Sequence, residues 1–190
     1  MTTPSEGPRE VLLQRIVEWF AINGVLDTSM RTLAAGVGTS NRMLNYHFGS
    51  RNQLLAAVIG TVCEAEGQAL EDCFAEAHDP VEAGRVYWEH VAETARIFAP
   101  LFYELSAHAM YGKPYAEQLR HILTDAWVSG FSRGFARVTD QPQADRLARL
   151  CLAVGRGILF ELALTGDRDA ADAAIDQFTT MTRQTLAPSR

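Results

Sequence analysis

Four polar residues between positions 41 and 46 have the types and the spacing that could read a nucleic acid. With roughly 100° per residue along an α-helix, Asn45 lies about 40° from Asn41, while Arg42 and Tyr46 follow at about 100° and 140°. Two amides, a guanidinium and a phenol on one face can bond to base edges in the major groove or to phosphate oxygens. The same four side chains could instead form the solvated face of a small helical bundle.

The opposite face of this segment is mostly apolar and must pack against other elements. It carries Met43, Leu44, His47 and Phe48, and Ser40 offers an N-capping hydroxyl in front of it. A helix of about eight residues is too short to be stable alone, so tertiary packing has to hold it in place. We therefore expect Leu44 and Phe48 to be core residues.

The charges are distributed unevenly along the chain. Between residues 28 and 52 lie Arg31, Arg42 and Arg51 with no Asp or Glu, whereas from residue 53 onward 19 acidic residues outnumber 12 basic ones. The local field decides phosphate affinity, so the net charge of −6 does not exclude a nucleic-acid partner. A helix that begins at Arg51 would add free backbone N–H groups, an arrangement that binds phosphate.

The hydrophobic pattern predicts an all-α protein. Apolar residues recur at helical spacing, no run alternates as a strand would, and no repeat is present. Capping residues and Pro or Gly breaks mark the ends, including a capping box of Ser50 and Gln53 and pauses at Ala99-Pro100 and at residues 112–114. The expected helices, about nine in all, include residues 9–23, 30–36, 41–47, one from about 51, one from about 80, then 115–138, 143–164 and 169–186.

Two short stretches resemble the DNA-binding signature of the TetR family of transcriptional regulators. They are residues 33–40 (LAAGVGTS) and residues 44–51 (LNYHFGSR), and the resemblance covers about residues 10–55. It implies a three-helix helix-turn-helix domain at 9–52 and a helical effector-binding and dimerisation domain at 53–190. Residues 1–8, which are polar and contain Pro4, Gly7 and Pro8, are expected to form a disordered arm. The implied function is sequence-specific DNA binding, most simply by a repressor that a small-molecule effector releases.

The resemblance also implies which residues face the DNA. Arg51 takes the place of the family's usual lysine, and Asn45 stands where the family usually has a phosphate-contacting tyrosine, with Tyr46 one position later. That departure leaves the phosphate contact open and does not change the expected docking. The DNA-facing residues carried over are Thr28, Ser29, Arg31, Ser40, Asn41, Arg42, Asn45, Tyr46, His47 and Arg51.

For the second half, the resemblance implies an unidentified small-molecule effector inside a helical bundle and a homodimer formed through the last two helices. The dimer would bind a palindromic operator in double-stranded DNA. Aromatic residues are dense between positions 87 and 135, which suits an apolar pocket, although for any single one of them ordinary core packing is the favoured explanation. The pocket candidates are Trp88, Phe98, Phe102, Tyr103, Met110, Tyr111, Trp127 and Phe131.

Other classes of function find less support. We expect neither an enzyme nor a cofactor or metal protein, because no phosphate loop, activated nucleophile or carboxylate pair stands out. Glu104 and His108, four residues apart, could ligate a metal, but two ligands do not make a site. An interaction module that kept the fold without binding DNA remains an alternative.

The expected location is the cytoplasm. The three cysteines lack metal or redox spacing and are expected to be free thiols in a reducing compartment. The first residues lack the apolar stretch of a signal peptide, and no run reaches the roughly 18 apolar residues of a membrane span.

Overall fold

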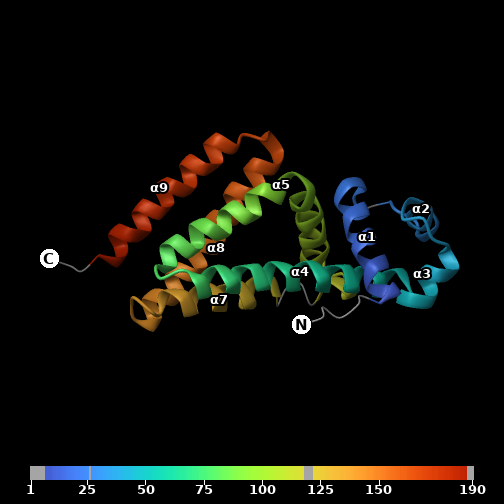
Figure 1. The fold of residues 1–190 in the computed structure, drawn as a ribbon, viewed down its shortest axis with the longest axis horizontal. Coiled ribbons are helices and arrows are strands. Elements are labelled where there is room, and N and C mark those ends of the chain that lie inside the picture. The colour runs from blue at the N-terminus through green and yellow to red at the C-terminus, as the bar shows by residue number, and fades with distance from the viewer. Residues whose placement is uncertain (1–6, 26, 118–121, 188–190) are drawn as a thin grey trace. The chain divides into compact units, whose positions relative to one another are not determined.

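The computed structural model describes residues 7–25, 27–117 and 122–187, and within these ranges the chain is helical and contains no strand. The all-α fold class is confirmed. The elements, labelled in Figure 1, are α1 (Pro8–Asn23), α2 (Met30–Gly36), α3 (Asn41–Phe48), α4 (Arg51–Glu76), α5 (Pro80–Met110), a 3-10 turn (Pro114–Ala116), a π-helical turn (Ile122–Ala126), α7 (Trp127–Phe135), α8 (Gln141–Thr165) and α9 (Arg168–Leu186).

The chain forms two compact units, and α4 and α5 contribute to both. Unit 1 contains residues 1–63 and 100–120, and unit 2 contains residues 64–99 and 121–190. Unit 1 therefore joins the first three helices to the start of α4 and the end of α5. The predicted domain boundary at residue 53 stays a prediction, and most of the predicted arm at residues 1–8 lies outside the described residues.

The core of unit 1 is made of aliphatic and aromatic side chains that periodic spacing places on one face of each helix. Ile16 and Phe20 of α1 are 0% and 1% exposed, and Leu44 of α3 is 0% exposed. Leu54 of α4 and Leu101 of α5 are also fully buried. Burying several large side chains of this kind stabilises a small unit by about 1.5–3 kcal/mol each.

Side-chain caps fix where the short helices begin. The hydroxyl of Ser29 accepts the N–H of Thr32 at 3.1 Å, and the hydroxyl of Ser40 accepts the N–H of Met43 at 3.2 Å. Each hydroxyl satisfies one of the N–H groups that a helix start leaves without a partner.

The predicted capping box at the start of α4 is confirmed by reciprocal bonds. The Ser50 N–H donates to Gln53 Oε1 at 2.8 Å, and the Gln53 N–H donates to Ser50 Oγ at 3.3 Å. The start of α4 is thereby fixed directly after α3.

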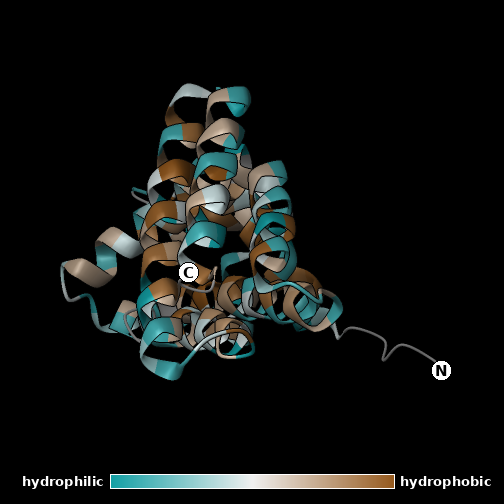
Figure 2. Cartoon of the chain, turned by 90° about the vertical axis from the view of Figure 1, so that its left-hand side faces the viewer, coloured by the Kyte–Doolittle hydropathy of each residue, from teal (hydrophilic) through white to brown (hydrophobic). Residues whose placement is uncertain are grey.

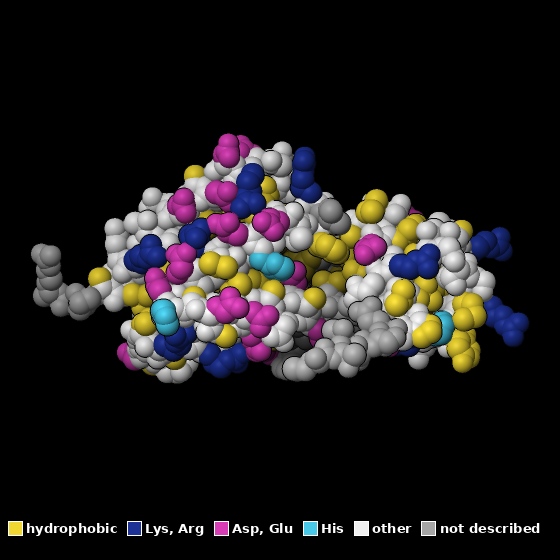
Figure 3. All heavy atoms as spheres, viewed as in Figure 1, with side chains coloured by type: hydrophobic (Ala, Val, Ile, Leu, Met, Phe, Trp, Pro, Cys, Tyr) yellow, Lys and Arg dark blue, Asp and Glu magenta, His cyan; other side chains and the backbone are white. Residues whose placement is uncertain are grey.

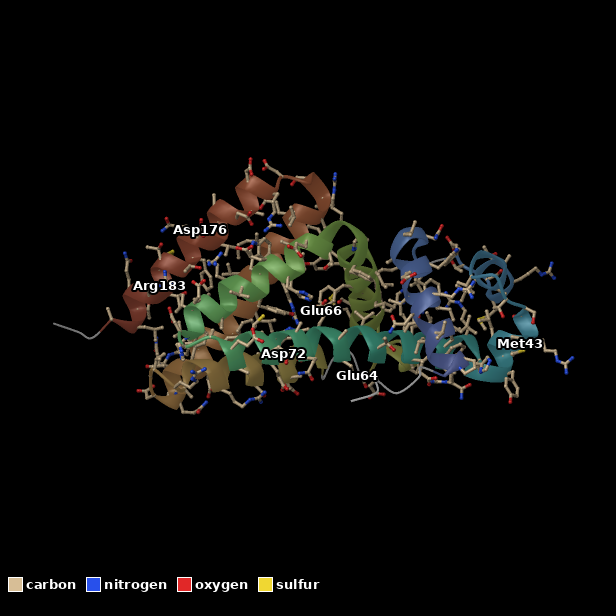
Figure 4. All side chains as sticks on the ribbon, viewed as in Figure 1. Met43, Glu64, Glu66, Asp72, Asp176 and Arg183 are labelled. Carbon is tan, nitrogen blue, oxygen red and sulfur yellow. The ribbon has the colours of Figure 1, made fainter. Side chains whose placement is uncertain are left out.

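The core of unit 2 is an aromatic and aliphatic cluster between α5, α8 and α9. Trp88 packs with Ala95, Leu162 and Ile175, among other buried residues. The Trp88 indole N–H also donates to Asp172 Oδ1 at 2.7 Å, which ties α5 to α9. In Figure 4, Arg183 lies on the last turns of α9, and its guanidinium contacts Asp79 Oδ2 at 3.3 Å.

Two glycines let α7 approach α4 closely within unit 2. A Cβ atom on Gly134 would collide with the Phe74 ring, and its distance to Phe74 Cζ would be 3.2 Å. A Cβ atom on Gly130 would lie 2.9 Å from Leu70 Cδ2. A side chain at position 134 would therefore force the Phe74 ring or the helices to move, whereas the flexible end of Leu70 could turn away from one at position 130.

Two predictions about where the helices break differ from the structure. The predicted pause at Ala99-Pro100 is wrong, because α5 continues through Pro100. Ala99 and Leu101, on either side of it, are 3% and 1% exposed, so packing compensates for the backbone hydrogen bond that proline removes. The expected continuous helix over residues 115–138 is also wrong, since its described parts are a 3-10 turn, a π-helical turn and α7.

Helix polarity is mixed throughout the described chain. Figure 2 shows hydrophilic and hydrophobic residues interleaved along the helices. Among the residues that the structure describes, no helix is both long and apolar enough to cross a membrane.

Candidate nucleic-acid interface

Helix α3 separates into a buried face and an exposed polar face, as its sequence predicts. Leu44 is 0% and Phe48 is 6% exposed, so both expected core positions are confirmed. Tyr46 is 77% exposed, and Asn41, Arg42 and Asn45 are exposed with it. Figure 4 shows Met43 on the side of α3 away from α1, and Met43 is 40% exposed rather than packed on the apolar face.

The residue that follows Tyr46 supports its ring. The rings of Tyr46 and His47 meet edge to face with centroids 5.0 Å apart, and His47 is half-buried. The Arg9 guanidinium from α1 donates to the His47 carbonyl at 3.4 Å and lies 5.1 Å from the centroid of Phe48. The end of α3 is therefore fixed against the start of α1.

Polar residues before and within α2 make up the second part of the candidate interface. Thr28 is half-buried, and its hydroxyl donates to the Gly24 carbonyl at 3.3 Å. Ser29 caps α2, and Arg31 is exposed. The Ser29 hydroxyl is already engaged with Thr32, so its availability to a phosphate stays a prediction.

Arg51 has structural partners that the sequence does not reveal. Its Nη2 donates to the Val25 carbonyl at 2.8 Å, and its Nε donates to the Thr28 carbonyl at 3.3 Å. The side chain is half-buried and ties the start of α4 to the α1–α2 loop. The predicted phosphate contact is not tested by these bonds, and it would have to share the guanidinium with them.

Contacts from α1 hold the turn between α2 and α3. The Arg15 guanidinium donates to the Val37 carbonyl. Gly36 packs against the Trp19 ring so closely that a Cβ atom there would lie 2.7 Å from Trp19 Cε2. Gly38 has φ of +67°, a conformation that glycine adopts without strain. The tight predicted connection between the two short helices thus depends on these two glycines.

The charge around the candidate interface is positive. On the face seen in Figure 3, acidic side chains gather over α4, α5 and α9, whereas Lys and Arg side chains project from the region of α2 and α3. Arg31 and Arg42 are exposed, and residues 28–52 contain no carboxylate. A surface of this kind attracts phosphates locally although the whole chain is acidic.

The eight pocket candidates divide between the two units. Trp88, Phe98, Trp127 and Phe131 belong to unit 2, and Phe102, Tyr103, Met110 and Tyr111 belong to unit 1. Met110 and Tyr111 are 80% and 82% exposed, while Trp88, Trp127 and Phe131 are at most 7% exposed. That all eight line one pocket stays a prediction.

Unit 2 contains a network of hydrogen-bonded side chains that the sequence analysis did not predict. The Trp127 indole N–H donates to the Tyr87 hydroxyl at 3.1 Å, and that hydroxyl donates to Glu66 Oε2 at 3.2 Å. The other Glu66 oxygen lies 3.7 Å from His90 Nε2, and Figure 4 shows Glu66 on the side of α4 that faces α5. Burial and the charge of Glu66 raise the pKa of Tyr87. These residues are far apart in sequence, so only the fold brings them together.

The two residues considered as metal ligands have different partners. The Glu104 carboxylate accepts the Val25 N–H, and His108 Nδ1 lies 3.0 Å from the Tyr115 hydroxyl. Both contacts lie within unit 1.

Comparison with known proteins finds a family match for the first helices of the chain. Residues 12–58 match the sequence model of a family described as bacterial regulatory proteins, tetR family. No curated protein matches the sequence.

Solved structures of similar fold cover nearly the whole chain. A transcriptional regulator from Rhodococcus sp. Rha1 has a TM-score of 0.76 at 20% identity, covering 94% of this chain and 97% of its own. A TetR transcriptional regulator from Legionella pneumophila has a TM-score of 0.72 at 16% identity, covering 93% and 99%. A TetR-family regulator from Pectobacterium atrosepticum has a TM-score of 0.66 at 26% identity, covering 96% and 95%.

Proposed function

We propose that this chain is a homodimeric repressor of the TetR family that a small molecule releases from DNA, because residues 12–58 match the tetR family model and the fold is similar to that of solved TetR regulators. One observation supports the proposed DNA binding most strongly. The polar face of α3 is exposed while Leu44 and Phe48 on its other face are buried. Such a helix can enter a major groove while its scaffold keeps it rigid.

The residues divide by their chemistry into base readers and phosphate binders. Asn41 and Arg42, on the first turn of α3, have side chains that form paired hydrogen bonds with adenine or guanine edges. Tyr46, Ser29 and Arg31 offer hydroxyl and guanidinium groups to phosphates. Phosphate contacts position the protein, and base contacts give it sequence preference.

The test of DNA reading is selection of binding sites from a random duplex pool, followed by affinity at two salt concentrations. The proposal predicts a palindromic site whose half-sites are about 34–36 Å apart, because each protomer places one α3 in successive major grooves. Affinity should fall steeply with salt as phosphate counterions are released. No enriched sequence at low salt, with co-purified small molecules removed, would favour the interaction-module alternative.

An exposed apolar stripe on α8 supports the homodimer. Leu150, Phe160 and Leu164 are 49%, 49% and 70% exposed, and the exposed Ala153 and Gly157 lie between them. The spacing of three and four residues is that of a helix–helix seam. A Cβ atom on Gly157 would meet nothing within 4 Å in the single chain, which leaves room for a second helix.

Helix α9 carries a second set of exposed apolar residues. Ala170, Ala174 and Met181 are exposed, Met181 by 54%, and Ile175 and Thr179 face inward. Two helices from each protomer can form a four-helix interface around a two-fold axis.

Adjacent residues on α9 give a matched test of the dimer. Met181→Glu places a charge among these exposed apolar residues, and Thr180→Glu places the same charge on the neighbouring exposed position. Sedimentation equilibrium should show a dimer that Met181→Glu weakens by at least about tenfold and Thr180→Glu leaves intact. Equal effects of the two variants would place the interface elsewhere.

We also propose that an apolar, aromatic effector binds within unit 2. Support comes from the aromatic surroundings of Trp127 and Phe131 and from the Tyr87 and Glu66 groups, which could orient a ligand. An effector that binds better to a conformation unable to span two grooves must weaken DNA binding. Any compound that lowers operator affinity should bind the DNA-bound protein more weakly by the same factor. Unchanged operator affinity with every compound that binds unit 2 would refute the coupling.

No enzymatic activity forms part of the proposal. The assigned roles of the chain are binding DNA, a second copy and a small molecule. The cytoplasm, where DNA is accessible in bacteria, is the location that this function requires.

A further inference from the structure

Both polar groups of one buried residue, Val25, are held by side chains from distant parts of unit 1. Its N–H donates to the Glu104 carboxylate, at 2.8 Å to Oε2 and 3.1 Å to Oε1. Its carbonyl accepts from Arg51 Nη2 at 2.8 Å. Val25 is 0% exposed, so neither group can turn to water for a partner.

The described residues of the loop around Val25 form a turn, in which the Thr28 N–H donates to the Val25 carbonyl at 3.4 Å. Gly24 has φ of +76° and Asp27 has φ of +58°, conformations outside those of a helix or strand. Thr28 donates to the Gly24 carbonyl, and Arg51 donates to the Thr28 carbonyl as well as to that of Val25. Side-chain bonds therefore add to this turn bond in fixing the loop, and the Glu104 bond ties the loop to α5.

This loop leads directly into the residues proposed to face DNA. Thr28 ends it, Ser29 caps α2, and Arg31 lies in the first turn of α2. A loop that loses the Glu104 bond leaves a buried N–H without a partner and will rearrange to satisfy it.

We propose that Glu104 is a positioning residue for DNA reading: it holds the Val25 amide and so fixes the loop that presents Thr28, Ser29 and Arg31. The inference rests on the proposed function. Glu104 has two opposite effects on DNA affinity under this proposal, because its carboxylate also repels phosphates. Removing the charge alone should tighten binding, whereas loss of the positioning bond should weaken it.

A matched pair of variants separates the two effects. Glu104→Gln and Glu104→Met remove the same charge and keep a similar length, but only the Gln side chain retains an oxygen that can accept the Val25 N–H. Two quantities are measured: amide hydrogen exchange at Val25, and affinity for a duplex enriched by the wild-type protein at fixed salt.

The proposal predicts that Glu104→Met exchanges the Val25 amide at least about tenfold faster and binds the duplex about tenfold more weakly. Glu104→Gln should stay within about threefold of the wild type in both. Amides of α1 that precede the loop, such as that of Val17, should keep their protection. A merely structural role would lower the melting temperature without separating Met from Gln in DNA affinity at a temperature where both are folded.

Equal DNA affinity of the two variants, or unchanged exchange at Val25 in Glu104→Met, would overturn the proposal. Should Glu104→Met fail to fold, Glu104→Asp decides in its place, since it keeps the charge but draws the carboxylate back from the Val25 N–H by one methylene. Wild-type exchange at Val25 and wild-type duplex affinity in Glu104→Asp would overturn the proposal. If the wild-type chain enriches no duplex, the proposed function fails, and the exchange measurement alone decides whether Glu104 fixes the loop.

Discussion

Replacing Gly36 by alanine should destabilise the unit that contains the first three helices. The substituted Cβ atom would lie 2.7 Å from Trp19 Cε2 and 2.8 Å from Trp19 Cδ1, and closer still to Trp19 Nε1. The indole is rigid, so the ring or α2 itself has to move. Overpacking of this kind costs about 1–3 kcal/mol.

A smaller effect opposes this cost. Alanine is better than glycine inside a helix by about 1 kcal/mol, although Gly36 is the last residue of α2 and gains less. The net expected loss is about 1–2 kcal/mol, or roughly 2–8 °C in melting temperature for a chain of this size. Thermal and urea unfolding, followed by circular dichroism, measure it.

Gly60→Ala is the matched control for this substitution. Gly60 lies in α4 in the same unit, and a Cβ atom there would meet nothing within 4 Å. This variant should be as stable as the wild type or up to about 1 kcal/mol more stable. If Gly36→Ala behaves like Gly60→Ala, the close packing of α1 against α2 is not what holds the turn. The cost of Gly36→Ala should also shrink when Trp19 is replaced by leucine.

Two further substitutions test a helix cap and a partly exposed ion pair. Ser40→Ala removes the hydroxyl that accepts the Met43 N–H and should cost about 1 kcal/mol in unfolding free energy, against a few tenths for Ser40→Gly, and equal losses would contradict the capping role. Burial opposes the charged form of Asp172, but hydrogen bonds from Trp88 and Arg168 outweigh it and lower the pKa of that carboxyl. The stability this adds is present above the carboxyl's unfolded pKa and is lost as pH falls through the lowered one, so Asp172→Asn should flatten the acid side of a stability–pH curve, and an unchanged curve would contradict it.

Local signals predicted the first helices well. The hydroxyl cap at Ser40 and the Ser50 capping box set helix starts that the structure reproduces. Such signals act within three residues, so the sequence displays them directly.

Two features that the local sequence does not display account for the predictions that were wrong. Pro100 reads as a break in sequence, yet buried neighbours on both sides carry α5 through it. Periodicity across residues 115–138 predicted one helix, and it cannot distinguish an α-helix from the π-helical turn at Ile122–Ala126.

The same limit applies to the candidate site. The amphipathic face of α3 follows from spacing alone. The carbonyl partners of Arg51, by contrast, lie 23 and 26 residues away, and the Glu104 bond to Val25 spans 79 residues. Contacts at that separation depend on the fold and have no local signature.

The most direct test of the central claim is the base preference of Arg42→Ala. Arg42 is exposed on α3 and makes its proposed contact to a base edge, whereas Tyr46 is proposed to contact phosphate. Affinities for the selected site and for each of its single base-pair changes should show that Arg42→Ala loses about 1–3 kcal/mol at one position of each half-site and keeps its preference elsewhere. Tyr46→Ala should weaken binding to every sequence alike. A uniform loss from Arg42→Ala, with no relaxed position, would contradict the claim that the exposed face of α3 reads DNA sequence.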